Sequence, residues 1–240
     1  LLNVDKISGS TFLGEDAGLT NIAGNSTGVG QRTLYRNQGA GNTAFGASGL
    51  NNNTTGNLNT SVGLSALAMN TTGSRNSAVG QGSLNNNTTA NDNTAGGYQS
   101  LSLNTVGSNN TAYGSQAGYS VTADLNNLNN AVFVGYNATA NSNNLSNVIA
   151  IGSGAQVTKS NQAVIGNSSI SETLVRGAVT DSLRVTGGAA SGKVLTSDAV
   201  GNATWQSPAA SGIGGSGTVN KLALFSATGT IADSLVSQSA

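Results

Sequence analysis

The sequence predicts an all-β fold, a parallel β-solenoid (β-roll) of about ten coils. A glycine recurs every 16 or 17 residues in the first half of the chain, and other residue types keep fixed positions relative to it. Charged and aromatic residues make up only 8% and 4% of the sequence. A repeat this short cannot bury a core alone, so it must stack on its neighbours as one coil of a solenoid. The anchor glycines of the regular block are Gly30, Gly46, Gly63, Gly80, Gly97 and Gly114.

Aligning the repeats on these anchor glycines gives one leucine column and two asparagine columns. The leucines are expected in the core. The asparagines are expected to form ladders of amide hydrogen bonds, because equivalent residues of successive coils stack about 4.8 Å apart. Four residues after the anchors stand Leu34, Leu50, Leu67, Leu84 and Leu101. Seven residues after them stand Asn37, Asn53, Asn70, Asn87 and Asn104, and four residues before them stand Asn42, Asn59, Asn76, Asn93 and Asn110.

Each coil is expected to contain a short strand that ends at its anchor glycine. The residue before the anchor is usually apolar, as in Phe45 and Val79, and two residues earlier comes Thr or Ser, as in Thr43 and Ser77. Such alternation is typical of a strand with one packed face, and we expect leucine and valine columns to supply the core. Glycine supplies the following turn because it tolerates positive φ and lets the next coil approach closely. The leucine then opens a second short strand or a buried corner, and Asn-Thr-Thr-Gly forms the return turn.

The solenoid is expected to span residues 10–167, after a lead-in at residues 1–9. Beyond Gly114 the next anchor comes 21 residues later, and we place the extra residues in a loop at 121–130 that bulges from one coil. An accidental insertion is the favoured interpretation of this loop, and receptor contact is the other. The chain has no Asn-Gly dipeptide, a strong hairpin signal, which favours parallel coils. The anchors outside the regular block are Gly14, Gly135, Gly152 and Gly166.

The composition changes after the solenoid, since 31 of the 33 asparagines lie before residue 168. Residues 168–210 are expected to form a β-rich neck or hairpin module, with two strands joined by a turn at 199–202. Residues 211–217, SGIGGSG, have the composition of a flexible linker. Residues 218–240 are expected to form a short β module that continues the fibre, with a turn at Thr228-Gly229. Modules below about 40 residues rarely fold alone, so we expect oligomerisation to stabilise them.

The composition excludes several classes of function. The sequence contains no histidine and no cysteine, which removes the commonest general base, the thiolate nucleophile, the usual zinc ligands and any disulfide. Nine cations balance nine anions, so the chain lacks the basic field of a nucleic-acid binder. No run approaches the roughly 20 apolar residues of a membrane span, and no signal peptide is visible. We therefore expect no catalytic residue, no cofactor, no metal and no membrane insertion, in a piece of a longer polypeptide.

Carboxylates are the only remaining candidates for catalysis. Glu15 and Asp16 are adjacent and would face opposite sides of a strand. Asp92 and Asp124 lie two coils apart, at a spacing close to that of inverting glycosidases. Asp92 and Asp124 stand at different distances from their anchor glycines, so they do not share a column. Neither pair is therefore expected to converge on a substrate, and we interpret all four residues as solvated loop acids.

Two surfaces are candidates for binding. Arg32 and Arg36, near Tyr35, could grip a phosphate or a glycan, although a solvated rim is the favoured interpretation. A hydroxyl column could face one side of the coil as an ice-binding surface. It lacks the paired threonines of such a surface, so a role at strand edges or at a chain interface is favoured. The column consists of Thr43, Thr60, Ser77, Thr94 and Thr111.

The coils AVFVG, VIAIG and QAVIG, which end at Gly135, Gly152 and Gly166, resemble the head repeats of trimeric autotransporter adhesins. The NTAFG and NTTG coils are similar to longer variants of that repeat in surface and bacteriophage tail-fibre proteins. The resemblance covers residues 10–167 and implies three chains that wind parallel coils side by side into one rod. The 17-residue period, the asparagine content and the lack of a coiled-coil stalk and membrane anchor depart from the adhesin pattern. These departures affect the expected secretion route more than the fold.

Together these observations predict a structural segment of an extracellular homotrimeric fibre, a phage tail fibre or a bacterial surface adhesin, that acts as a stiff attachment spacer. A cell-surface glycan or protein receptor would be bound through parts outside this fragment, by threefold multivalency of weak contacts. The alternative is a monomeric ice- or surface-binding β-solenoid, and a remote one is a polysaccharide-degrading β-helix. Mass in solution separates the first two, because the fibre requires three chains.

Overall fold

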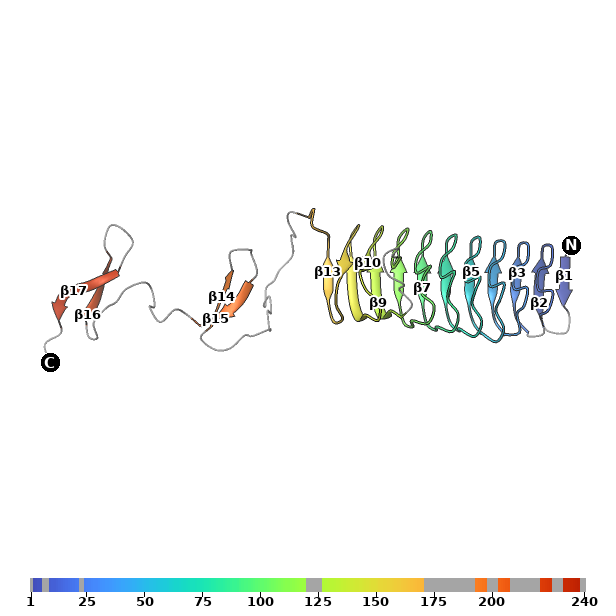
Figure 1. Ribbon diagram of the computed structural model, residues 1–240, viewed down its shortest axis with the longest axis horizontal. Helices are drawn as coiled ribbons and strands as arrows, with labels where there is room; N and C mark the ends of the chain where they lie inside the picture. Colours follow the sequence, from blue (N-terminus) through green and yellow to red (C-terminus); the bar gives the residue numbers. More distant parts are fainter. Residues whose placement is uncertain are drawn as a thin grey trace. The chain divides into compact units, whose positions relative to one another are not determined.

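The computed structural model describes residues 2–5, 9–21, 24–119, 127–170, 193–197, 203–207, 221–225 and 231–237. The chain divides into two compact units, Leu1–Thr173 and Leu174–Ala240. The elements of the described residues are all strands. The first unit is a parallel β-solenoid of about nine turns (Figure 1), which confirms the predicted fold class.

One sheet of eleven strands runs the length of the first unit. Ten of them are parallel and follow one another in chain order, one in each coil (Figure 1). The lead-in strand β1 (Leu2–Asp5) pairs antiparallel with the first of these and closes the N-terminal edge of the sheet. The parallel strands are β2 (Ser10–Leu13), β3 (Thr27–Val29), β4 (Thr43–Phe45), β5 (Thr60–Val62), β6 (Ser77–Val79), β7 (Thr94–Gly96), β8 (Thr111–Tyr113), β9 (Asn129–Val134), β11 (Ser146–Ile151) and β13 (Ala163–Ile165).

The anchor glycines stack on one another where these strands end. Phe45 pairs with Val62 in the next coil, and Val62 pairs with Val79, so the glycines that follow them lie in register. At Gly63 φ is 126°, and a Cβ there would lie 2.7 Å from the carbonyl carbon of Gly80. A side chain at this position would adopt a disfavoured conformation and also collide with backbone, so only glycine fits.

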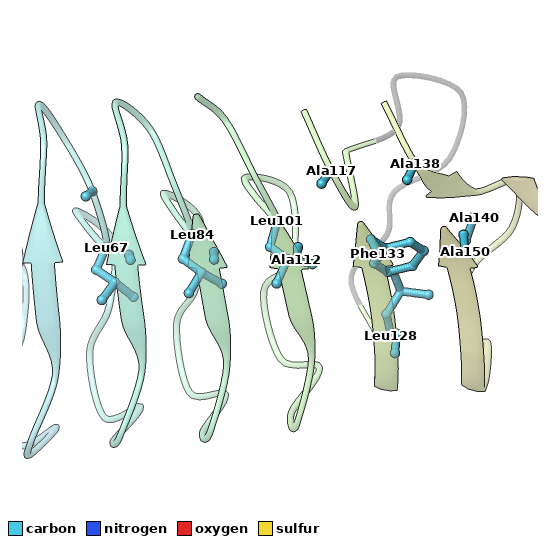
Figure 2. Close-up of a cluster of buried hydrophobic side chains, with 14 of the residues drawn as sticks. Leu67, Leu84, Leu101, Ala112, Ala117, Leu128, Phe133, Ala138, Ala140 and Ala150 are labelled. Atoms are coloured by element: carbon cyan, nitrogen blue, oxygen red, sulfur yellow. The ribbon is translucent and has the colours of Figure 1, made fainter. Parts of the chain in front are cut away.

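The leucine column fills the interior of the central coils. Leu67, Leu84 and Leu101 are fully buried and lie one after another inside successive coils (Figure 2). The column lies in turns, with φ between 48° and 51°, so the structure forms the buried corner rather than a second strand. Positive φ is uncommon for a bulky residue. Hydrogen bonds between coils stabilise this backbone conformation at the leucines. For example, the N–H of Leu67 donates to the carbonyl of Ser83 at 3.0 Å.

Two phenylalanines fill the interior where the leucine column is interrupted. Gly18 and Gly118 stand four residues after an anchor, where the five coils between them carry leucine. A Cβ at Gly18 would lie 2.5 Å from the ring of Phe12, and one at Gly118 would lie 3.1 Å from the ring of Phe133. A large residue in a strand is thus combined with a glycine corner, which keeps the interior volume close to that of alanine plus leucine.

Both asparagine columns are buried and form hydrogen-bonded ladders. In the column seven residues after the anchors, the Nδ2 of Asn70 donates to the Oδ1 of Asn53 at 2.7 Å and to the carbonyl of Gly73 at 2.9 Å. In the column four residues before them, the backbone N–H of Asn76 donates to the Oδ1 of Asn59 at 2.9 Å. Most of these amides therefore bond to backbone groups as well as to a neighbouring coil, as buried polar groups require. The first ladder ends at Asn87, because its Oδ1 has no partner among the described residues and the Nδ2 of Asn104 donates to the carbonyl of Gly107 instead.

The coil after Gly114 accommodates its extra residues without a change of register. β8 pairs with β9 so that Tyr113 stands opposite Val134. The Nδ2 of Asn110 donates to the carbonyl of Leu128, 18 residues later, whereas the equivalent bond in earlier coils spans 14 residues. The additional residues therefore enter between Asn110 and Leu128, a range that overlaps the predicted loop at 121–130. The prediction is wrong at the end of that loop, since Asn129 and Asn130 belong to β9. Residues 120–126 lie outside the described part of the chain.

The last coils have longer strands and a mostly apolar interior. β9 and β11 each contain six residues, whereas β3 to β8 contain three. A second strand appears in these coils, where β10 (Thr139–Ala140) pairs in parallel with β12 (Gln156–Val157). The interior is made of buried apolar side chains, among them Leu145, Val148 and Val157.

The second unit contains two antiparallel hairpins in its described residues. β14 (Val194–Ser197) pairs with β15 (Ala203–Gln206), and β16 (Lys221–Phe225) pairs with β17 (Ile231–Ser237). Strands are thus present on both sides of each predicted turn. The turns themselves, at 199–202 and Thr228-Gly229, and the predicted linker at 211–217 lie outside the described residues.

Candidate functional site

The outward face of the long sheet carries a column of apolar side chains. In the three-residue strands β3 to β8 the middle residue is buried and the two flanking residues are more exposed. The expectation that the residue before each anchor belongs to the core is wrong, since Phe45 and Val79 are 42% and 48% exposed. We call these residues the outer apolar column. Its members are Leu13, Val29, Phe45, Val62, Val79, Tyr113, Val134, Ile151 and Ile165.

The period of a strand explains this error. Thr43 and Phe45 are two residues apart, so they must share one face of the sheet. Ala44 and Leu50 are fully buried and fill the thin interior. The face that Thr43 and Phe45 share is therefore the outer one. The signal was present in the sequence, because threonine and the apolar residue alternate with the small residue between them.

The outer apolar column lacks a side chain at one position, Gly96, but its apolar surface is not interrupted there. A Cβ at Gly96 would lie 2.6 Å from the ring of Tyr113 in the next coil, so that ring covers the space. The column contains no charged residue. Single exposed apolar side chains are ordinary on protein surfaces, whereas a contiguous apolar stripe marks an interaction surface.

A column of hydroxyl side chains runs beside the outer apolar column on the same face. These residues pair in register from coil to coil and are half-buried. Among the described residues, their hydroxyl groups have no hydrogen-bond partner. They do not satisfy strand edges there, and they can bind water or another molecule. The column consists of Thr27, Thr43, Thr60, Ser77, Thr94 and Thr111.

The structure does not bring Asp92 and Asp124 together as a catalytic pair within the described residues. Arg75 of the preceding coil binds Asp92 through its Nε at 2.6 Å and its second guanidinium nitrogen at 2.8 Å. The hydrogen bond from Arg75 lowers the pKa of Asp92 below its ordinary value. Asp124 lies outside the described residues.

The acidic pair Glu15 and Asp16 lies in the turn after β2, not in a strand. The expectation that these side chains face opposite sides of a strand is therefore wrong. Asp16 has a φ of 57°, and the carboxylate of Glu15 accepts a hydrogen bond from the Nε2 of Gln31 at 2.7 Å. This contact links two adjacent coils on the exposed surface.

The basic cluster near Tyr35 makes a local contact. The guanidinium carbon of Arg32 lies 4.8 Å from the centre of the Tyr35 ring, within cation–π distance. Arg36 is exposed on the same turn. Because Arg32 stacks on a residue of its own turn, we favour the interpretation of these residues as a solvated edge of the coil rather than a phosphate or glycan site.

Other kinds of site were sought in the described part of the chain. Within it, no three acidic side chains gather where they could hold a metal ion. A helix long and apolar enough to cross a membrane is likewise not found among those residues. Comparison with known proteins finds no matching family model, curated protein or solved structure. The described surface therefore offers ordered columns for binding. The predicted leucine and asparagine columns lie inside the coils that support these surface columns, and the anchor glycines are half-buried where the strands end.

Proposed function

We propose that this chain is a structural segment of an extracellular homotrimeric fibre that acts as a stiff attachment spacer. The observation that carries the proposal is the outer apolar column, whose described members other than Val29 are between 36% and 67% exposed. Water would contact this stripe along the whole shaft of an isolated chain. If another polypeptide covers the stripe, its apolar area is removed from water. This stabilises the complex by roughly 25 cal/mol for each Å² of apolar surface that is buried.

A second copy of this chain is the partner that best matches the column. Its members repeat once in each coil, in register with the sheet. A surface with the same spacing can contact every member, whereas a partner with another period falls out of step within a few coils. Three copies is the number implied by the adhesin and tail-fibre repeats that the coils resemble.

The proposed mechanism is mechanical. Backbone hydrogen bonds and asparagine ladders join each coil to the next, so the shaft resists bending along its axis. Three chains present three copies of any weak contact, and multivalency raises the overall avidity without a strong single site. A phage tail fibre and a bacterial surface adhesin both fit this description.

Mass in solution tests the proposal. Light scattering after size exclusion should give three times the chain mass of 23.6 kDa. Val79→Arg, in the middle of the outer apolar column, should shift the protein towards single chains. Leu58→Arg is the matched control: Leu58 is 63% exposed outside the column, and Arg75 occupies the equivalent position of the next coil with nearly the same φ. A wild-type protein that stays a single chain at all concentrations would refute the proposal.

A monomeric ice-binding solenoid is the second candidate, and the hydroxyl column favours it. Its outward hydroxyl groups lie in register and are unbonded within the described residues. In this case the protein would have the mass of one chain and would slow ice recrystallisation. Thr60→Lys, in the middle of the column, would abolish that activity.

A further inference from the structure

A groove of about 250 Å³ opens on the turn side of the central coils. It lies across the anchor glycines from the outer apolar column, because its first residues directly follow Gly63, Gly80 and Gly97. Its principal lining residues are Leu64, Gln81, Gly82, Asn85, Tyr98 and Gln99.

The groove exists because Gly82 lacks a side chain where neighbouring coils have one. In the coils from Gly46 to Gly114, the residues two positions after the anchors have φ between 52° and 66°. A Cβ at Gly82 would meet only the Cγ of Gln99, at 3.4 Å, which is an ordinary contact. Unlike the anchor glycines, Gly82 is therefore not required by the winding of the coil. The residues of this column are Ser48, Ser65, Gly82, Gln99 and Gln116.

The groove is lined by apolar side chains and by side-chain amides that make no hydrogen bond to other described residues or keep one polar atom free. Tyr98 and Leu64 are 46% and 48% exposed, and Gln81 stands between them in the same column. The side-chain amides of Gln81 and Gln99 make no hydrogen bond to described residues. Asn85 donates from its Nδ2 to the carbonyl of Ser65 at 2.8 Å and keeps its Oδ1 as an acceptor. Each free amide offers both donors and an acceptor.

We propose that this groove binds one ring of a neutral saccharide. A sugar ring presents C–H groups on its faces and hydroxyl groups at its edges, which matches an aromatic wall beside amides. The lining contains no charged residue, so a phosphate, sulfate or carboxylate group would find no counter-charge. The volume is below the range of about 300–1,000 Å³ that is typical of sites for drug-sized ligands, which limits the occupant to a single ring.

The saccharide site does not rest on the proposed trimer. A single chain contains every lining residue, so binding and oligomeric state can fail independently. In a trimer the groove would be present three times, and weak binding at each copy would add through multivalency.

Saturation-transfer NMR on the full chain tests the site. The probes are methyl glucopyranoside, methyl galactopyranoside and N-acetylglucosamine, with glucose 6-phosphate and sialic acid as charged comparators. We expect saturable transfer from at least one neutral sugar, with a Kd of about 1 mM, and none from the charged ones. Tyr98→Ala and Gly82→Gln should each weaken binding at least about tenfold. The second substitution introduces the residue that the next two coils already have at this position, as Gln99 and Gln116, with a similar φ.

Tyr136→Ala is the matched control, because Tyr136 also directly follows an anchor glycine and is 59% exposed. It should leave binding unchanged, and equal melting temperatures should show that all three variants fold. The proposal is overturned by a response that does not saturate for any neutral sugar. An equal loss in Tyr136→Ala, full binding by Gly82→Gln, or equal binding of the charged sugars would overturn it as well.

Discussion

The central coils and the last coils fill the same thin interior in different ways. Between Gly46 and Gly97 each coil has a three-residue strand, a leucine corner and buried asparagines. Around Gly135 and Gly152 the strands have six residues, and the interior is mostly apolar, with Phe133 beside aliphatic side chains. The difference shows that a polar interior is compatible with a solenoid when most of its amides bond to a neighbouring coil or to backbone groups.

This comparison implies that the central coils depend on their neighbours more strongly than the last coils do. An aliphatic side chain tolerates a shifted neighbour, because dispersion contacts are not directional. A buried amide that loses its partner keeps an unsatisfied group at a cost of about 1–3 kcal/mol. Substitutions in the two regions should therefore differ in how far their damage spreads.

The largest effect is expected from Leu67→Asp in the central coils. Leu67 is fully buried, and the buried residues that the structure describes include no charged side chain, so the substitution removes a core side chain and buries an unpaired carboxylate. We expect a loss of about 5 kcal/mol or more of unfolding free energy. Chemical denaturation followed by circular dichroism measures it. Leu67→Met, which nearly conserves volume, should stay within about 1.5 kcal/mol. Equal stability of the aspartate variant would refute the coil register.

Gly80→Val should rank second, because it opposes the close stacking of the anchors. Gly80 has a φ of 129°, and a Cβ there would lie 2.4 Å from the carbonyl oxygen of Gly97. We expect a loss of at least about 2 kcal/mol from backbone strain, with steric collision in addition. Gly82→Ser is the control in the same coil, since Ser65 has a similar φ at the equivalent position. An unchanged melting curve for Gly80→Val would contradict the stacked arrangement.

An intermediate effect is expected within the asparagine ladder itself. Asn70→Ala removes the donor to Asn53 and the acceptor of Asn87, so two buried amides lose partners. The expected loss is about 2–4 kcal/mol of unfolding free energy. Asn104→Ala, in the coil after the ladder ends at Asn87, should cost less, because Asn104 donates only to the carbonyl of Gly107 and its Oδ1 has no partner among the described residues. Thermal melts of the two variants side by side measure the difference, and equal losses would contradict the ladder.

The sequence predicted the features that repeat. The spacing of Gly46, Gly63 and Gly80 placed the coils in register, and the buried leucine and asparagine columns followed from it. Each of these signals occurs in several coils, so it stands out against chance.

Features that occur once or twice were not predictable in the same way. The combination of Phe12 with Gly18 appears outside the leucine column, and only the packed interior shows that one compensates for the other. The outward position of Val79 was missed, although the period of two required it once Ala78 was assigned to the interior. The choice between corner and strand at Leu67 could not be made, because a positive φ at leucine contradicts local propensity and is imposed by contacts between coils.

The smallest effect is expected at the exposed ion pair of Arg75 and Asp92. The side chains are 58% and 39% exposed, so water screens the interaction. The hydrogen bond from Arg75 lowers the pKa of Asp92 in the folded state. The stabilisation is therefore present above the unfolded pKa and is lost as pH falls through the folded value.

Asp92→Asn should lower the melting temperature only slightly at neutral pH, and the difference from wild type should vanish in acid. Thermal melts from neutral pH down to below the ordinary pKa of aspartate check both points. Asn109, which occupies the equivalent position in the next coil, shows that an asparagine fits this backbone. A large loss at neutral pH would mean that contacts on the outer surface, and not only the interior ladders, hold successive coils together.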